Sequence, residues 1–281
     1  MKNIMVLTDF GPVARHAIDY ACQLCNDTQA ENLYLLNTFE TVPLYDAGEA
    51  GVLTINLQQT EETEESRRES LKQLKQDVAH QLQATHIISL MASGDLADVV
   101  NEIGKENNID LVVIGVKSKE MLEEAFFGSH TYRAIEHIKS PVLVVPPQAA
   151  IQSPENVLLA ADFDNLGSNT TLQRLTSFLE IFKTQKLTAI HRVSAPQHIG
   201  HTRTLAENLE SYFKDHQCKV NFIDQSANLP NALNDHAQKN SVSLIITIHK
   251  TRGFFSSLFH KSMTKEIAWH STLPVLVFHV K

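Results

Sequence analysis

The sequence predicts an α/β protein built from two tandem doubly wound domains, each with a five-stranded parallel sheet. Two motifs recur along the chain: VLTDF at residues 6–10 returns as LAADF at 159–163, and SPVLVV at 140–145 returns as LPVLVF at 273–278. The offsets of 153 and 133 residues are too long for a solenoid repeat, so each copy has the size of a domain. Short apolar runs alternate with helical patterns in both copies, which predicts parallel strands joined by crossover helices.

In the first copy, five apolar and often β-branched runs predict strands, and the segments between them carry apolar residues at helical spacing. The expected strands are Ile4–Thr8, Leu33–Asn37, Ile87–Met91, Leu111–Gly115 and Val142–Val145. The expected helices are Ala14–Cys25, Thr60–Gln83, Leu96–Glu106 and Ser129–His137.

The second copy repeats this order. Its expected strands are Val157–Ala161, Leu187–His191, Val220–Ile223, Leu244–Ile248 and Val275–Phe278, and its expected helices are Asn169–Phe182, Thr204–His216, Asn231–Gln238 and Ser262–His270. Strand two matches at an offset of 154 and strand three at 133, so the second copy is about twenty residues shorter between them. We therefore expect domains at residues 1–147 and 154–281, joined by a short extended linker from Pro146 to Pro154.

Two features of the first copy's longer crossover stand out. The stretch Thr41–Leu57 contains two glycines and is expected to form a mobile flap at the edge of the sheet. The charge run at residues 61–69 is interpreted as a solvated helix face, in which Glu64 and Arg68 have favourable i,i+4 spacing.

Composition limits the possible functions. The chain has 281 residues and a net charge of −8, which argues against nucleic acid or an anionic membrane as the main partner. No run of eighteen apolar residues is present, so no membrane span is expected. The three cysteines are typical of a reducing cytoplasm. Cys22 and Cys25 form a C-x-x-C, but they lie in an apolar helical pattern and are interpreted as buried thiols rather than a redox pair.

Candidate ligand-binding residues of the first copy follow strands one, two and four, where open parallel sheets bind ligands. They are Asp9 after strand one, Thr38 and Phe39 after strand two, Gly115 and Ser118 after strand four, and Gly128 and Ser129 at the start of the last helix. Free backbone N–H groups and the helix dipole attract anions at such a helix start. Spacing alone leaves two interpretations open, namely an anion site and a plain turn before a capped helix.

These features together resemble the universal stress protein family: a strand-one Asp, a glycine-containing loop ending in Gly-Ser after an apolar fourth strand, and a closing P-V-L-V-V strand. The resemblance covers nearly the whole chain as two tandem domains, and it implies the adenine nucleotide alpha hydrolase-like fold. One branch of the family binds ATP. Carried over to this sequence, the resemblance implicates Asp9, Thr38, Phe39, Gly115, Ser118, Gly128, Ser129 and His130 in nucleotide binding. Ser118 departs from the pattern, because the family has glycine at this position.

The second copy departs further, with Ile248 in place of Gly115, Thr251 in place of Ser118 and Lys261 in place of Gly128. We therefore expect no nucleotide binding there. Asp162, His191 and His249 all lie at the carboxyl ends of expected strands of this copy and could form a metal site, but no tight ligand spacing supports one. No metal is expected, and these residues are interpreted as lining a vestigial cleft.

The favoured function is a cytoplasmic stress-response protein whose first domain binds an adenine nucleotide, ATP above all, as a regulatory ligand. The alternative is a nucleotide-independent interaction scaffold with two vestigial clefts. An enzyme is not expected beyond weak ATP hydrolysis, because no P-loop and no nucleophile with an adjacent base is present. Val142–Val145 and Val275–Phe278 are apolar edge candidates, and family members commonly dimerise through the last strand. We expect these strands to pair within the chain as a pseudo-dimer, and a homodimer remains open.

Overall fold

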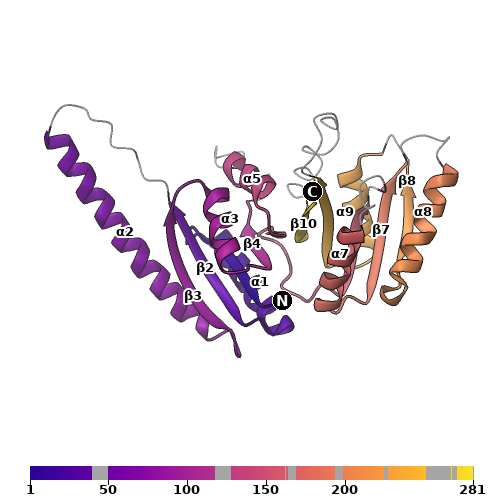
Figure 1. The fold of residues 1–281 in the computed structure, drawn as a ribbon, viewed down its shortest axis with the longest axis horizontal. Coiled ribbons are helices and arrows are strands. Elements are labelled where there is room, and N and C mark those ends of the chain that lie inside the picture. Colours follow the sequence, from indigo (N-terminus) through magenta and orange to yellow (C-terminus); the bar gives the residue numbers. More distant parts are fainter. Residues whose placement is uncertain are drawn as a thin grey trace.

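The computed structural model describes residues 1–39, 50–117, 128–161, 163, 169–193, 199–224, 227–250, 267 and 271–280. Its ten strands form one sheet in the order β3-β2-β1-β4-β5-β10-β9-β6-β7-β8 (Figure 1). The strands are β1 (Asn3–Leu7), β2 (Asn32–Phe39), β3 (His86–Ser93), β4 (Leu111–Gly115), β5 (Val142–Val145), β6 (Asn156–Ala161), β7 (Lys186–Arg192), β8 (Lys219–Ile223), β9 (Leu244–Lys250) and β10 (Val275–Val280). Each half contributes five parallel strands, as the sequence predicts.

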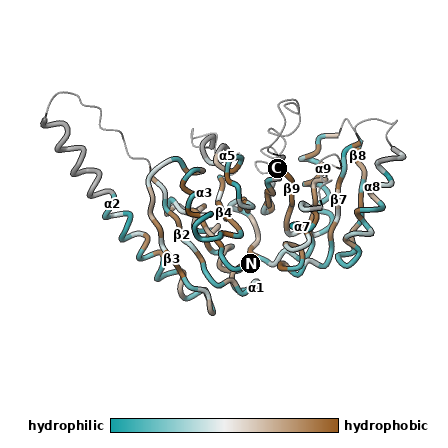
Figure 2. The backbone as a smooth tube through the Cα atoms, viewed as in Figure 1, coloured by the Kyte–Doolittle hydropathy of each residue, from teal (hydrophilic) through white to brown (hydrophobic). Residues whose placement is uncertain are grey.

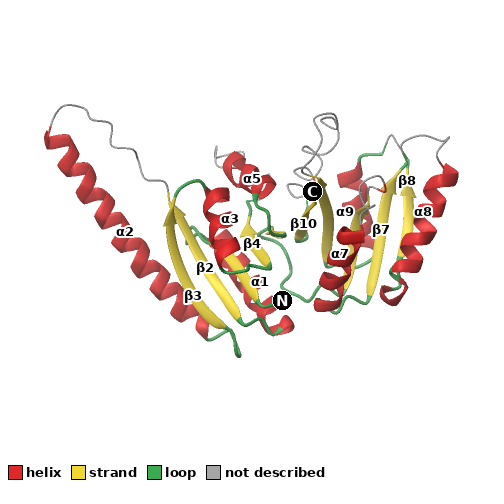
Figure 3. Ribbon diagram, in the orientation of Figure 1, coloured by secondary structure: helices red, strands yellow, loops and turns green. Residues whose placement is uncertain are grey.

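Helices cover both faces of this sheet, shown in red in Figure 3. They are α1 (Pro12–Thr28), α2 (Ala50–Ala79), α3 (Leu96–Glu106), α5 (Gly128–His137), α7 (Asn169–Ile181), α8 (Ile199–Tyr212) and α9 (Leu229–Lys239), with a 3₁₀ turn η2 at Lys214–His216. Helices α1, α2, α7 and α8 share one hydrophobic cluster, and α3, α5 and α9 share the other. Residues of the central strands alternate between the two clusters, so both faces of these strands are buried, as expected for parallel strands, whereas the edge strands β3 and β8 are partly exposed. The interior is accordingly apolar along both layers (Figure 2).

The two halves meet where β5 pairs with β10 in antiparallel orientation. Leu143 lies opposite Leu276, which is its own counterpart at the 133-residue offset, and the neighbouring pairs are Val142 with Val277 and Val144 with Val275. This register is symmetric about Leu143 and Leu276, so a local two-fold axis passes between them.

Hydrogen bonds from side chains to the backbone repeat between the halves. Asn3 Nδ2 donates to the carbonyl of Asn107 at 2.8 Å, and Asn156 Nδ2 donates to the carbonyl of Asn240 at 2.6 Å. Both asparagines therefore fix the loop that precedes the fourth strand of their half. The third strands depart from the expected offset: Tyr34 pairs with Ile88 but Thr188 pairs with Lys219, which makes the offset 131. A two-residue change keeps the same side chains on the same face.

Several expected boundaries change. The helix expected at Thr60–Gln83 is α2 and begins at Ala50, so the C-terminal part of the expected Thr41–Leu57 flap is helical. Residues 41–49 lie outside the described residues. The helix expected at Thr204–His216 ends at Tyr212 and is followed by η2. The helix expected at Ser262–His270 lies outside the described residues except for Ile267. The crossover from β2 to β3 spans 40–85 and that from β7 to β8 spans 193–218, which confirms the expected shortening.

The expected solvated face of α2 is confirmed by an exposed ion pair between Arg68 and Glu64 at 4.0 Å. Within the described part of the chain, no helix combines the length and the apolar character needed to cross a membrane.

The C-x-x-C is confirmed as a pair of buried, free thiols on α1, and Cys218 is also buried and free. Burial raises the pKa of Cys22 and of Cys218 to about 12 and raises the pKa of Cys25 further. Thiolate, the reactive form, is therefore scarce at neutral pH.

We expect native protein near pH 8 to be protected from Ellman's reagent, whereas denatured protein should release three thiol equivalents. Raising the pH by about one unit should accelerate the reaction of the denatured chain without exposing the native thiols. Rapid titration of one or two thiols in native protein would contradict the burial of the C-x-x-C pair.

Candidate functional site

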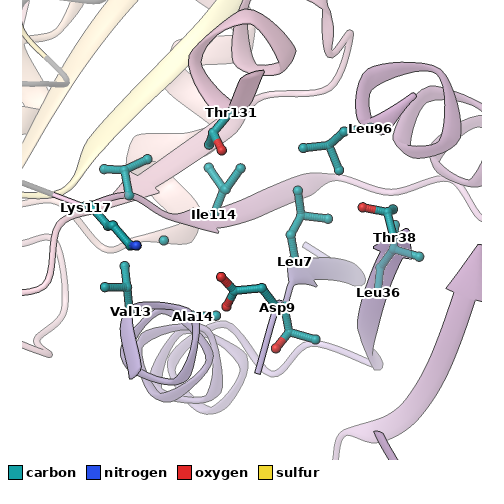
Figure 4. Close-up of a pocket in the computed structure, with 13 residues that line it drawn as sticks. Leu7, Asp9, Val13, Ala14, Leu36, Thr38, Leu96, Ile114, Lys117 and Thr131 are labelled. Atoms are coloured by element: carbon teal, nitrogen blue, oxygen red, sulfur yellow. The ribbon is translucent and has the colours of Figure 1, made fainter. Parts of the chain in front are cut away.

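A cavity of about 220 Å³ opens at the carboxyl ends of β1, β2 and β4 in the first half. The chain places β2 and β3 on one side of β1 and then returns to place β4 on the other, so the strand order reverses here. Such a reversal leaves a crevice between neighbouring loops. The lining residues are Leu7, Thr8, Asp9, Val13, Ala14, Leu36, Thr38, Leu96, Ile114, Gly115, Val116, Lys117 and Thr131 (Figure 4).

Asp9 is an exposed residue two positions after the end of β1. Its Oδ1 accepts a hydrogen bond from the backbone N–H of Gly11 at 2.8 Å, which turns the chain into α1 one residue before Pro12. The carboxylate is thereby held at the rim of the cavity (Figure 4). Its second oxygen, Oδ2, forms no hydrogen bond with another described residue.

Gly115 is required by a close helix contact. A Cβ atom at this position would lie 2.6 Å from the carbonyl oxygen of Val13 in the first turn of α1. Its φ is not in the left-handed region, so glycine is needed here for close approach and not for a left-handed turn. Glycine instead allows α1 to approach β4, which sets the width of the cavity between them.

The floor of the cavity is apolar and its rim is polar. Leu7, Leu36 and Ile114 come from three adjacent strands and are buried. Thr38, at the end of β2, faces the same space (Figure 4). A flat apolar group therefore fits the floor, with hydrogen-bonding groups available around it.

The lining residues that were not proposed from the sequence include two with polar groups that face the cavity, Lys117 and Thr131. Lys117 follows Gly115 by two residues, and its ammonium group points into the cavity (Figure 4). Thr131 lies in the first turn of α5 and faces the cavity from above Ile114 (Figure 4). A lysine two residues after the glycine of strand four was the available signal, because it places a cation beside the proposed anion site.

Phe39 does not line this cavity. Neighbouring residues of a strand point to opposite faces, so Thr38 faces the cavity and Phe39 faces α2. The guanidinium of Arg67 on α2 lies 5.7 Å from the Phe39 ring centroid, and its Nη1 donates to Asn37 Oδ1 at 3.2 Å. These contacts anchor α2 to the end of β2.

The remaining candidates of the first half lie on the last helix and its preceding loop. Gly128, Ser129 and His130 form the first turn of α5, which brings their backbone N–H groups to the same end of the sheet as Asp9. Thr131 in this turn lines the cavity. Ser118 lies outside the described residues.

In the second half, strand register places Ile248 at the position of Gly115: Gly115 pairs with Val145, and Ile248 pairs with Phe278 at the 133-residue offset. An isoleucine cannot provide the close approach that Gly115 allows. Thr251, Lys261 and Asp162 lie outside the described residues, so the rest of that comparison remains a prediction.

His191 occupies the position of Asn37. Asn37 Nδ2 donates to the carbonyl of Thr8 at 2.7 Å, and His191 Nδ1 lies 3.1 Å from the carbonyl of Ala161, the counterpart of Thr8. The His191 ring stacks on Phe163 with centroids 4.2 Å apart. The histidine therefore takes the place of a structural asparagine. Within the described ranges no group of three His, Cys, Asp or Glu side chains could hold a metal ion.

Comparison with known proteins agrees with this architecture. The model of the universal stress protein family matches residues 1–146. A universal stress protein from Archaeoglobus fulgidus superposes with a TM-score of 0.74 at 15% identity, covering 99% of this chain and 98% of that chain. A putative universal stress protein from Pseudomonas aeruginosa superposes with a TM-score of 0.61 at 16% identity, covering 99% and 93%. No curated protein sequence matches.

Because the family model matches more than half of its length, the chain belongs to the universal stress protein family. The likeness to full-length solved structures shows the same two-half fold.

The contact of Gly115 with α1 gives a direct test. Gly115→Ala should lower the free energy of unfolding by about 1–3 kcal/mol, because the new methyl group overlaps the Val13 carbonyl. The measurement is urea unfolding of the full chain followed by circular dichroism.

Gly200→Ala is the matched control. A Cβ atom at Gly200 meets nothing within 4 Å, and alanine favours the helical conformation, so this variant should keep or gain up to about 1 kcal/mol. Equal stability of the two variants would refute the steric role of Gly115.

Proposed function

We propose that this protein is a regulatory adenine-nucleotide-binding protein of the cytoplasm, with one nucleotide site, in its first domain (residues 1–147). The observation that carries the proposal is the cavity itself: an apolar floor from three strands, flanked by Asp9 and Lys117 and facing the first turn of α5. The buried free thiols fit a reducing compartment.

The residues present fit the parts of a nucleotide. The floor of Leu7, Leu36 and Ile114 suits a flat base, and the free carboxylate oxygen of Asp9 can accept a hydrogen bond from an amino group. Lys117 and the backbone N–H groups of α5 suit phosphates. A volume of about 220 Å³ is below that of most small-molecule sites, so the cavity would enclose the base and leave the phosphates at its rim.

The second domain, residues 154–281, is proposed to bind no nucleotide and to serve as a fixed partner of the first. The antiparallel pairing of β5 with β10 supports a permanent intramolecular association. We propose neither an enzymatic reaction nor a nucleic-acid partner.

The first test is a calorimetric titration of the full chain with ATP, ADP and AMP, together with analysis of any nucleotide released on denaturing the purified protein. We expect one site per chain. If none of the three binds at about millimolar concentration, the nucleotide proposal fails, and a scaffold function takes its place.

Gly128→Lys places in the first half the residue that the second half carries at Lys261. If two charge-assisted hydrogen bonds from the α5 N-terminus are lost, at roughly 1.5–3 kcal/mol each, ATP binding should weaken at least about a hundredfold. Unchanged affinity for ATP in this variant would show that the phosphates do not reach α5.

Lys117→Gln should weaken ATP binding by about three- to tenfold and lower its salt sensitivity, because the ammonium of Lys117 is exposed and partly screened. Lys105→Gln is the control, since Lys105 lies in the last turn of α3, away from the cavity. Equal effects of both substitutions would indicate general charge rather than a local contact.

A further inference from the structure

The linker makes the two sides of the β5–β10 seam unequal. It runs along α1, where His16 Nε2 lies 2.9 Å from the carbonyl of Ala149 and the Tyr20 hydroxyl donates to the carbonyl of Gln152 at 3.3 Å. The Ser153 hydroxyl donates to Asp27 Oδ2 at 2.6 Å. One linker joins the two halves, and it lies in a groove along α1. The equivalent groove, along α7, is therefore not filled by a linker.

The groove along α7 is open, with a volume of about 470 Å³. It lies between α7 and the amino ends of β1, β4 and β5, so both halves contribute to it; in Figure 1 the N-terminus marks the first-half side next to α7. Phe178 and Ile181 of α7 form an apolar wall. The opening is far from the nucleotide cavity, which lies at the other ends of the strands.

The charged residues that line this groove are three cations, Lys2, Lys139 and Arg174, and one acid, Asp110. Asp110 Oδ2 accepts hydrogen bonds from the backbone N–H groups of Lys2 and Asn3 at 2.6 and 3.0 Å. The Lys2 ammonium pairs with Glu31 at 2.9 Å. Among the described residues, no carboxylate lies within 4.0 Å of Lys139 or Arg174. A chain with a net charge of −8 thus has a local excess of positive charge here.

Arg174 is held in place and remains a donor. Its Nη1 donates to the carbonyl of His279 at 3.2 Å, and its guanidinium lies 5.8 Å from the Phe278 ring centroid. Partial burial lowers its pKa, which reflects the cost of a charge without a counter-ion. A guanidinium has five N–H donors, so most of them are left for another partner.

We propose that this groove binds a small organic anion with an apolar body, such as an aromatic carboxylate or sulfonate. Its anionic group would pair with Arg174 and Lys139, and its apolar body would pack on Phe178 and Ile181. Such a ligand contacts both halves at once and stabilises the seam without occupying the nucleotide cavity.

The test is a fluorescence titration of the full native chain with 8-anilinonaphthalene-1-sulfonate, an aromatic sulfonate. We expect one saturable site with a Kd of about 10–100 μM. Arg174→Gln and Lys139→Gln should each weaken binding at least about fivefold, and Arg203→Gln, an exposed change on α8, should not. Urea midpoints identify any variant whose fold is impaired, and Lys139→Gln removes an exposed ammonium with no ion pair among the described residues.

Three outcomes would overturn the proposal. Equal affinity for the uncharged N-phenyl-1-naphthylamine would show that the anion is not recognised. Wild-type affinity in well-folded Lys139→Gln and Arg174→Gln would place the probe elsewhere. Displacement of the probe by ATP would assign it to the nucleotide cavity, whereas unchanged probe binding at a saturating ATP concentration supports a separate site.

Discussion

The antiparallel pairing of β5 with β10 is the constraint on which the rest of the structure depends. It places Leu143 against its own counterpart Leu276, and both side chains are buried. Because the sheet continues through this pair, each of the two hydrophobic clusters extends across both halves. The grooves on either side of the seam and the path of the linker follow from this pairing.

The internal repeat shows which features the fold requires. The Thr85 hydroxyl donates to the carbonyl of Ala30, and the His216 imidazole contacts the carbonyl of Thr184, which is the counterpart of Ala30 in the second half. Asn37 and His191 likewise contact equivalent carbonyls with different groups, an amide and an imidazole. A donor at a fixed place is therefore what these positions need, and more than one residue type supplies it.

The sequence predicted the strands well because buried parallel strands are short apolar runs bounded by polar residues; β4 and β5 have the expected bounds. It predicted Asp9, Thr38 and Gly115 at one end of the sheet because parallel strands share their carboxyl ends. It did not show that the Phe39 side chain faces α2, since its partner, Arg67, lies on a helix that is distant in the sequence. The reason for Gly115 was also beyond the sequence, because the contact with Val13 joins segments a hundred residues apart.

The linker that lies against α1 has a further consequence. In a dimer of identical subunits every substitution at the interface appears twice, and assembly weakens on dilution. Here the two partners share one chain, so their effective concentration is set by a few residues and does not change with the amount of protein. A substitution such as Ile248 in place of glycine then alters one partner alone, which allows the halves to specialise while they remain joined.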